Sequence, residues 1–322
     1  MDTCTDQWGQ NRGREADNPL QIPRRGWRDI LIRVFHEFFD DRILSLSAGV
    51  AFYALLAIFP AISTLVSLYG LFLDPTALRD QLDAASWFLP SGAIDVMKDQ
   101  ALRVMSQGSA TLGFSFALSF GVALWSANAG TKALIEALNI AYEEEETRSL
   151  VRLTLLTLGF TLAAVVFACV ALAAVVALPL LLKAVYLDAA AEWFISLLRW
   201  PILALTVAAL VAVIYRYGPC RAPARWKWLS LGSLAASVLW LAMSAGFSWY
   251  VSRFGSYNET YGSLGAVIGF MTWLWLSFSV ILLGAELNAE IEHQTARDTT
   301  TGAPLPLGAR DAEMADTVGP IP

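Results

Sequence analysis

Residues 153–182 read LTLLTLGFTLAAVVFACVALAAVVALPLLL, a run that contains no Asp, Glu, Lys or Arg. About 20 apolar residues are enough to carry an α-helix across the hydrocarbon of a bilayer. The chain as a whole is also apolar: 56% of the 322 residues are hydrophobic, 16% are charged and the mean hydropathy is +0.53. Soluble domains carry about 25% charged residues. The composition therefore excludes a soluble globular protein and predicts an all-α polytopic membrane protein.

Six apolar stretches predict a bundle of six transmembrane helices with interfacial amphipathic helices beside it. We expect the spans at about 46–73, 110–129, 152–182, 194–216, 229–252 and 261–286, within a membrane domain at 43–293. Polar tails at 1–26 and 294–322 flank this domain. Because neither tail buries enough apolar surface to offset the entropy lost on ordering, both are predicted to be disordered and cytoplasmic.

Residues 27–42, between the first tail and the first span, carry apolar side chains at helical spacing. The apolar positions are Trp27, Ile30, Leu31, Val34, Phe35, Phe38 and Phe39, and charged residues take the opposite face. The segment is too charged to cross a membrane, so we expect a helix that lies in the membrane interface. The alternative is a helix packed on the spans from the cytoplasmic side. Residues 74–109 predict two further short amphipathic helices.

The loop charges predict the orientation of the chain. With six spans, the side that holds both termini carries about 16 Lys and Arg, and the other side carries about 6, so both termini are expected in the cytoplasm. From the polar composition of residues 1–26 we expect no cleavable signal peptide before the first span. One cytoplasmic loop holds Arg216, Arg221, Arg225 and Lys227, which we expect to contact anionic headgroups. The alternative is that these residues serve only as a topology signal.

Signatures of catalysis are missing from the sequence. A net charge of −6 and a pI of 5.0 argue against nucleic acid as a partner, since phosphate binding needs a basic surface. Cys4, Cys169 and Cys220 lack metal-ligand spacing, and the two histidines, His36 and His293, lie in opposite tails. Phosphate-loop, HExxH and GxSxG motifs are absent. We therefore expect no enzyme activity, no cofactor and no metal.

Polar and irregular positions supply the candidate functional residues. No ionisable residue lies near the middle of a predicted span, which disfavours a charged relay. Pro60 is expected to kink the first span, either beside a cavity or as a packing device. Gly265 and Gly269 are spaced for close helix packing. Glu136 and Glu286 are expected at the cytoplasmic boundary, where they would meet each other or an arginine such as Arg148 or Arg152, or else act as ordinary helix-end carboxylates.

Four stretches taken together resemble the YihY/BrkB family of bacterial inner-membrane proteins. They are LSAGVAFYALLAIFPAIS (46–63), SANAGTKALIEALNIAYEEEETR (126–148), YRYGP (215–219) and YNETYGSLGAVIGFMTWLWLSFSVILLGAELNAEIE (257–292). The resemblance covers about residues 27–293 and implies a six-helix bundle in the bacterial cytoplasmic membrane. The positions that match the family's motifs are Asn128, Glu136, Asn139, Tyr142, Gly218, Tyr261, Gly262, Gly265 and Glu286.

Members of that family carry labels for a ribonuclease that processes transfer RNA, a virulence factor and an envelope or lipid-export protein. The sequence disfavours the ribonuclease, because it offers neither a basic face nor a set of metal ligands. We expect an envelope transporter or lipid-translocating protein, with membrane lipids as partners and homo-oligomers or envelope proteins as further ones. The expected pathway and gate residues are Asn128, Glu136, Asn139, Tyr142, Pro60, Tyr261, Gly262 and Glu286. The alternative is a membrane scaffold that transports nothing.

Overall fold

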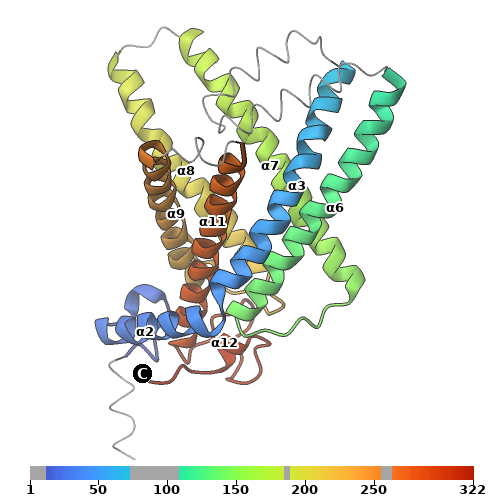
Figure 1. Ribbon diagram of the computed structural model, residues 1–322. Coiled ribbons are helices and arrows are strands. Elements are labelled where there is room, and N and C mark those ends of the chain that lie inside the picture. Colours follow the sequence, from blue (N-terminus) through green and yellow to red (C-terminus); the bar gives the residue numbers. More distant parts are fainter. Residues whose placement is uncertain (1–11, 73–108, 185–188, 255–262) are drawn as a thin grey trace, which may run out of the picture. The chain divides into compact units, whose positions relative to one another are not determined.

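The computed structural model describes residues 12–72, 109–184, 189–254 and 263–322. The regular structure in this part of the chain is helical, apart from one antiparallel bridge between Ala224 and Thr300. The predicted all-α fold class is confirmed for these residues. In chain order the helices are the 3-10 turn η1 (Pro19–Gln21), α2 (Arg24–Asp40), α3 (Ile43–Phe72), α6 (Ser109–Ala141), α7 (Leu150–Ala184), α8 (Ala189–Tyr217), α9 (Trp226–Phe254), α11 (Ser263–His293) and α12 (Glu313–Asp316) (Figure 1).

Six of these helices are long and apolar, and each predicted span falls almost wholly within one of them. The shortest has 29 residues, which gives a length of about 43 Å against about 30 Å of hydrocarbon. Within the described residues, three segments meet both the length and the hydropathy needed to cross a membrane: Leu150–Phe167, Trp226–Val251 and Val267–His293. Shorter apolar segments occupy Ile43–Ala57 and Ala204–Tyr217.

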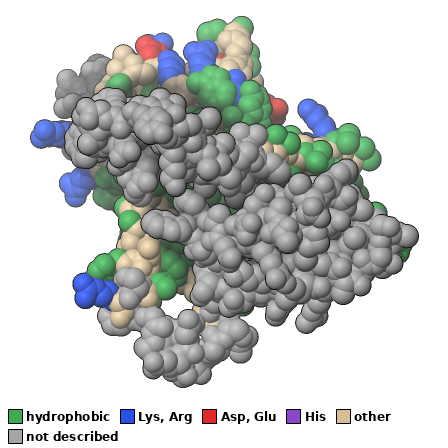
Figure 2. All heavy atoms as spheres, turned by 90° about the horizontal axis from the view of Figure 1, so that it is seen from above, with side chains coloured by type: hydrophobic (Ala, Val, Ile, Leu, Met, Phe, Trp, Pro, Cys, Tyr) green, Lys and Arg blue, Asp and Glu red, His purple; other side chains and the backbone are tan. Residues whose placement is uncertain are grey.

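The outer faces of the long helices are apolar, as a lipid environment requires. Leu150, Val151 and Leu155 on α7 are exposed, as are Leu234 and Val238 on α9. Figure 2 shows hydrophobic side chains on the surface of the described helices, among scattered Lys and Arg. In water such a surface would be a liability. These faces therefore favour a chain surrounded by lipid.

The chain divides into two compact units. Unit 1 comprises Met1–Ser47, Leu134–Met243 and Ser277–Pro322, and unit 2 comprises Ala48–Ala133 and Ser244–Leu276. Within unit 2, the indole nitrogen of Trp273 donates a hydrogen bond to the Ser244 hydroxyl at 3.2 Å, which joins α11 to α9. Each unit thus draws on helices that lie far apart in the sequence.

The core of unit 1 joins the ends of four long helices. Leu138 of α6, Tyr215 of α8, Leu229 of α9 and Leu282 of α11 are fully or almost fully buried in one cluster. A second cluster packs Ile30 and Val34 of α2 against Trp228 and Ile291. Accordingly, α2 lies across the ends of α9 and α11 (Figure 1). Burial of this apolar surface fixes the helix ends that carry the polar residues described below.

Gly232 of α9 and Gly284 of α11 lie at a close approach of two helices in unit 1. The Gly232 N–H donates to Asn288 Oδ1 at 2.9 Å. A Cβ atom on Gly284 would lie 2.5 Å from the Tyr215 hydroxyl oxygen and 2.6 Å from the Ala236 Cβ. Small residues let helix backbones approach closely in membrane bundles. These two glycines hold that role here.

The glycine pair expected from the sequence is Gly265 and Gly269 on α11. No described atom lies within 4 Å of a Cβ built on Gly269. Close packing at this pair stays a prediction. Its spacing is common in apolar helices and does not by itself distinguish it from the glycines that do lie against a neighbouring helix.

Both terminal segments are folded where they are described, so the prediction of disorder is wrong for residues 12–26 and 294–322. Met314 is buried in the core of unit 1. Arg310 donates through its guanidinium to the carbonyls of Ala315 at 2.5 Å and Ala296 at 2.8 Å. Asp316 accepts the Arg310 N–H at 2.9 Å. Polar composition predicts disorder only when the polar groups stay hydrated, and these groups bond within the protein instead.

We expect the substitution Gly284→Ala to lower the free energy of unfolding by about 1–3 kcal/mol, because the added methyl group overpacks the crossing. Thermal unfolding of the purified protein in detergent, followed by tryptophan fluorescence, measures the change. Gly246→Ala on α9 is the matched control, since no described atom lies within 4 Å of a Cβ there. A Gly284→Ala protein as stable as the control protein would contradict the packing.

Candidate functional site

The first candidate surface is α2, which packs one face on unit 1 and leaves another exposed. Ile30 and Val34 are buried, whereas Leu31, Phe35 and Phe39 are 58%, 63% and 56% exposed. The second alternative drawn from the sequence, a helix packed on the other helices, is thus seen for this face, and a position in the membrane interface stays a prediction. The helix packs on the bundle and keeps an apolar stripe that the described protein does not cover.

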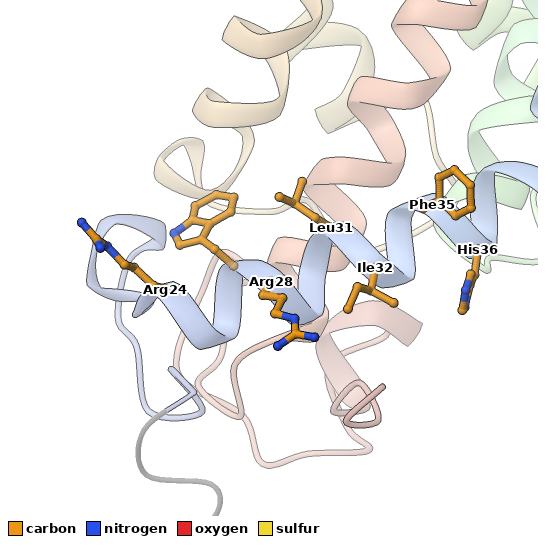
Figure 3. A pocket seen from close by; sticks show the side chains of 7 residues that line it. Arg24, Arg28, Leu31, Ile32, Phe35 and His36 are labelled. Carbon is orange, nitrogen blue, oxygen red and sulfur yellow. The ribbon is translucent and has the colours of Figure 1, made fainter.

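A shallow groove of about 710 Å³ runs along this helix (Figure 3). Its lining residues are Arg24, Trp27, Arg28, Leu31, Ile32, Phe35 and His36. In Figure 3, Leu31 and Phe35 point to one side of α2, and Arg28 and His36 point to the other. Such a helix places apolar side chains in the acyl region of a leaflet and guanidinium groups at the level of the phosphates. The surface is chemically suited to a phospholipid.

Ion pairs hold α2 in place from its packed face. Arg33 pairs with Glu290 of α11, and both side chains are buried. Its guanidinium also donates to Gln294 Oε1 at 2.8 Å. Near the start of α2, Arg12 pairs with Asp29 at 2.5 Å. The helix is therefore fixed by charge pairs beneath and free on its apolar stripe.

The second candidate surface is the polar end of unit 1, by which we mean the junction of α2 and α3, the α6–α7 loop, the α8–α9 turn and the last turns of α11. Asn139 connects two of these parts: its Oδ1 accepts the Cys220 N–H at 2.8 Å, and its Nδ2 donates to Glu146 at 3.0 Å. Arg148 donates to Glu146 at 2.7 Å and to the Gly218 carbonyl at 3.0 Å. The Arg148 hydrogen bond lowers the pKa of Glu146 to about 2.

Gly218 is required at this turn for a steric reason. A Cβ atom there would lie 2.6 Å from the Ile214 carbonyl oxygen and 3.0 Å from a methyl group of Leu138. Gly218 matches a family motif, and its place in the structure gives it a role in packing the end of α8 against α6.

A buried ion pair closes the polar end. Arg221 binds Glu292 at 2.7 Å, and the two side chains are 2% and 0% exposed. The guanidinium carbon lies 5.1 Å from the centre of the Tyr142 ring, and Thr299 donates to Glu292 at 2.7 Å. Burial raises the pKa of the Tyr142 hydroxyl. The prediction that Arg221 contacts lipid headgroups is wrong, because its charge is neutralised inside the protein.

Removal of one partner from this pair leaves the other as an uncompensated buried charge, which costs about 3–5 kcal/mol. We therefore expect Arg221→Met to destabilise the protein by that amount, and Arg221→Met combined with Glu292→Met to recover much of the loss. Unfolding midpoints of the wild type, both single variants and the double variant complete the cycle. Additive losses in the double variant would show that the pair does not interact.

The other three basic residues of the α8–α9 turn also contact protein groups. The Arg216 guanidinium lies 4.6 Å from the centre of the Trp226 ring and donates to the Ala224 carbonyl. Arg225 donates to the Thr300 carbonyl at 2.8 Å, and Lys227 donates to the Asp17 carbonyl. Contact of Arg216, Arg225 and Lys227 with headgroups stays a prediction.

Glu286 and Glu136 are not brought together as the sequence suggested. Glu286 is fully buried, whereas Glu136 is exposed on α6. The group that faces Glu286 is another carboxyl, that of Asp41 at the junction of α2 and α3. The expected arginine partner, Arg148, binds Glu146 instead. The structure therefore gives the two glutamates different surroundings.

The remaining predicted pathway residues fall in different places. Asn128 is buried on α6 in unit 2, and no described group hydrogen-bonds its Oδ1. Asn139 and Tyr142 belong to the polar end of unit 1, and Pro60 lies within α3. Tyr261 and Gly262 lie outside the described residues, as does the segment predicted to hold two short amphipathic helices.

Sequence reasoning missed Asp41, Arg33 and Glu292 as members of this site. Asp41 lies in the turn after α2 and Glu292 at the end of α11, where charge is the ordinary expectation, and Arg33 lies among other charged residues within α2. The signal that was available is the spacing of Glu286 and Glu290 on one face of a helix, one turn apart. No sequence pattern connects these glutamates with Asp41 or Arg33, which lie more than 240 positions away in the chain. Helical spacing relates only residues within one helix.

Burial raises the pKa of Glu144, in the α6–α7 loop, to about 7, against about 4.3 in an unfolded chain. The folded state then binds more protons than the unfolded state between these values, so this group's contribution to stability falls as the pH rises through that range. We expect Glu144→Gln to flatten the decline of the unfolding temperature between about pH 4.5 and 7. Glu145→Gln, at the exposed neighbouring position, is the control and should keep the wild-type slope. Equal slopes for the two variants would argue against the assignment.

Among the described residues, no group of three or more His, Cys, Asp and Glu side chains could bind a metal ion.

Comparison with known proteins gives relatives along most of the chain. A ribonuclease-like protein of Bacillus subtilis, YfkH, is 31% identical over 255 residues, which are 76% of this chain and 88% of that protein. A UPF0761 membrane protein of Xanthomonas campestris is 28% identical over 293 residues, 88% of this chain but only 64% of the relative. A UPF0761 membrane protein of Vibrio cholerae is 33% identical over 118 residues, 35% of this chain and 39% of the relative.

No solved structure matches the chain. The family described as virulence factor BrkB matches residues 34–305, from within α2 to beyond the end of α11. This range includes both the polar end and the long helices. The chain is therefore a membrane protein that belongs to the BrkB family.

Proposed function

We propose that this protein crosses the bacterial inner membrane six times, with both termini in the cytoplasm, and that it moves phospholipids between the leaflets. The six long helices α3, α6, α7, α8, α9 and α11 support the six spans. The excess of Lys and Arg on the side of the termini supports the orientation. In this arrangement the polar end of unit 1 faces the cytoplasm.

The observation that carries the lipid assignment is the exposed stripe of α2. Leu31, Phe35 and Phe39 would lie among acyl chains, while Arg24 and Arg28 would meet lipid phosphates along the groove. Because ion pairs fix the packed face of α2, the stripe is held at the edge of the bundle rather than on a loose tail. A lipid headgroup is thereby bound next to the cytoplasmic helix ends.

The polar groups within the long helices favour a lipid over a hydrophilic solute. Thr161 of α7 donates to the Thr157 carbonyl at 2.8 Å, and Ser237 of α9 donates to the Ser233 carbonyl at 2.7 Å. Hydroxyls that bond the backbone of their own helix contribute little polar surface to a pathway. A lipid needs no more than a narrow route for its headgroup, at whose cytoplasmic mouth we place Asn139, Tyr142 and Glu286.

The test is reconstitution of the purified chain into liposomes that contain fluorescent phospholipids, with a membrane-impermeant quencher added outside. We expect the wild type to expose the labelled lipid of the inner leaflet to the quencher. Arg28→Gln should slow this movement several-fold, because it removes a charge that lines the groove. Arg25→Gln is the matched control, since Arg25 is exposed on the same helix but does not line the groove.

A wild-type protein that leaves the inner-leaflet lipid protected, for anionic and zwitterionic labels alike, would refute lipid translocation. Equal rates for Arg28→Gln and Arg25→Gln, with translocation intact, would remove the groove from the mechanism. Circular dichroism of each variant confirms that it is folded.

The second candidate is a membrane scaffold, favoured by the folded terminal segments. Arg33 donates to the carbonyl of Pro320 at 3.1 Å, and Arg14 donates to that of Gly319 at 2.5 Å, so the two ends of the chain form one surface. Such a surface suits an envelope protein partner or a second copy of the chain. A folded protein that is inactive in the liposome assay would favour this function. Ribonuclease activity stays disfavoured, because a pI of 5.0 does not suit an RNA-binding face.

A further inference from the structure

Glu286 is a buried carboxyl group that no described hydrogen-bond donor satisfies. Its side chain is fully buried, and neither carboxyl oxygen has a hydrogen-bond partner among the described residues. An ionised carboxylate in such a place costs several kcal/mol unless a cation or several donors compensate it. The surroundings of Glu286 therefore decide which form it takes.

Acidic groups and a tyrosine surround Glu286. From α2 and its junction with α3 come Glu37 and Asp41, from α11 comes Glu290, and from the α6–α7 loop comes Tyr142. Asp40 and Glu143 lie further out, beside Glu37. The basic groups nearby are Arg33, which pairs with Glu290, and His293, whose Nδ1 lies 3.7 Å from Glu290. No described cation pairs with Glu286 itself.

The carboxyl group beside Glu286 is that of Asp41. Ile43, two positions after Asp41, is buried in one cluster with Ala285 and Ala289, which lie on either side of Glu286 along α11. Two ionised carboxylates can only accept hydrogen bonds, so neither group can satisfy the other unless one of them carries a proton. Burial raises the pKa of Asp41, which acts in the same direction. Two like charges side by side at a buried position are costly, so one of the two groups is favoured in its neutral form.

We propose that Asp41 and Glu286 form a proton-binding site, in which one proton is shared between the two carboxyl groups at neutral pH. The proton bonds to one carboxyl oxygen and is donated to the facing oxygen of the other group. Loss of this proton leaves two carboxylates in contact and pushes the start of α3 away from α11. Binding and release of the proton are thus linked to the packing of the polar end, whether or not the protein translocates lipids.

The first test is infrared spectroscopy of the full chain in lipid nanodiscs at pH 8, where Glu144 is ionised. We expect the wild type to show the carbonyl band of a protonated carboxyl group. Glu286→Gln and Asp41→Asn should each lose this band. In each variant the amide N–H can donate to the remaining carboxyl group, which can then be ionised. Asp40→Asn, at the exposed neighbouring position, is the control and should keep the band. Absence of the band in the wild type, or its persistence in both variants, overturns the proposal.

The second test is the pH dependence of the unfolding equilibrium. A variant that is merely less stable shifts the curve of stability against pH but leaves its slope unchanged. The folded wild type keeps one proton that unfolded Asp and Glu side chains release near about pH 4. Above that pH its unfolding equilibrium constant should rise about tenfold more per pH unit than that of Glu286→Gln, which is the effect of one proton. Parallel curves for the two proteins overturn the proposal. So does a wild type that Na⁺ or K⁺ stabilises at neutral pH in place of protons, since the site would then bind a metal cation.

Discussion

The packing of unit 1 depends on the neutralisation of charge at the ends of apolar helices. Arg33 with Glu290 and Arg221 with Glu292 place four charged groups in positions that water scarcely reaches. Charges buried in this way are tolerated only as hydrogen-bonded pairs. Both glutamates lie on α11, two residues apart and within two turns of Glu286, so one helix end organises α2, the α8–α9 turn and the C-terminal segment. The apolar core of the unit can close because these pairs remove charge from its rim.

The architecture was predictable because it rests on hydrophobicity alone. The apolar runs along the chain are longer than a membrane is thick, and each became a helix in the described residues. The same reasoning failed for residues 294–322, because composition does not reveal where an arginine finds carbonyls. Arg310 bonds four different carbonyl groups there, which turns a polar tail into a folded segment.

The site was predictable only in part, for a reason of distance along the chain. Helical spacing identified the two faces of α2 and placed Glu286 and Glu290 on one face of α11. It gave no information on which residues from other helices meet them. Asp41 follows α2 by a single position and looks like an ordinary helix-end aspartate, so its contact with Glu286 emerges only from the fold. Arg221 was misassigned for the same reason, since a basic loop beside a membrane helix usually faces phosphates.

The two charge pairs and the carboxyl pair differ in a way that bears on function. The ion pairs of Arg33 and Arg221 join a guanidinium group to a carboxylate without a shared proton, so these contacts with α11 are permanent. Asp41 and Glu286 instead depend on a proton whose concentration the cell changes. When the proton is lost, the two ion pairs on α11 stay in place and only the contact between Asp41 and Glu286 changes. The start of α3 is therefore the element of the polar end that is free to respond, while α2 and its exposed apolar stripe stay fixed.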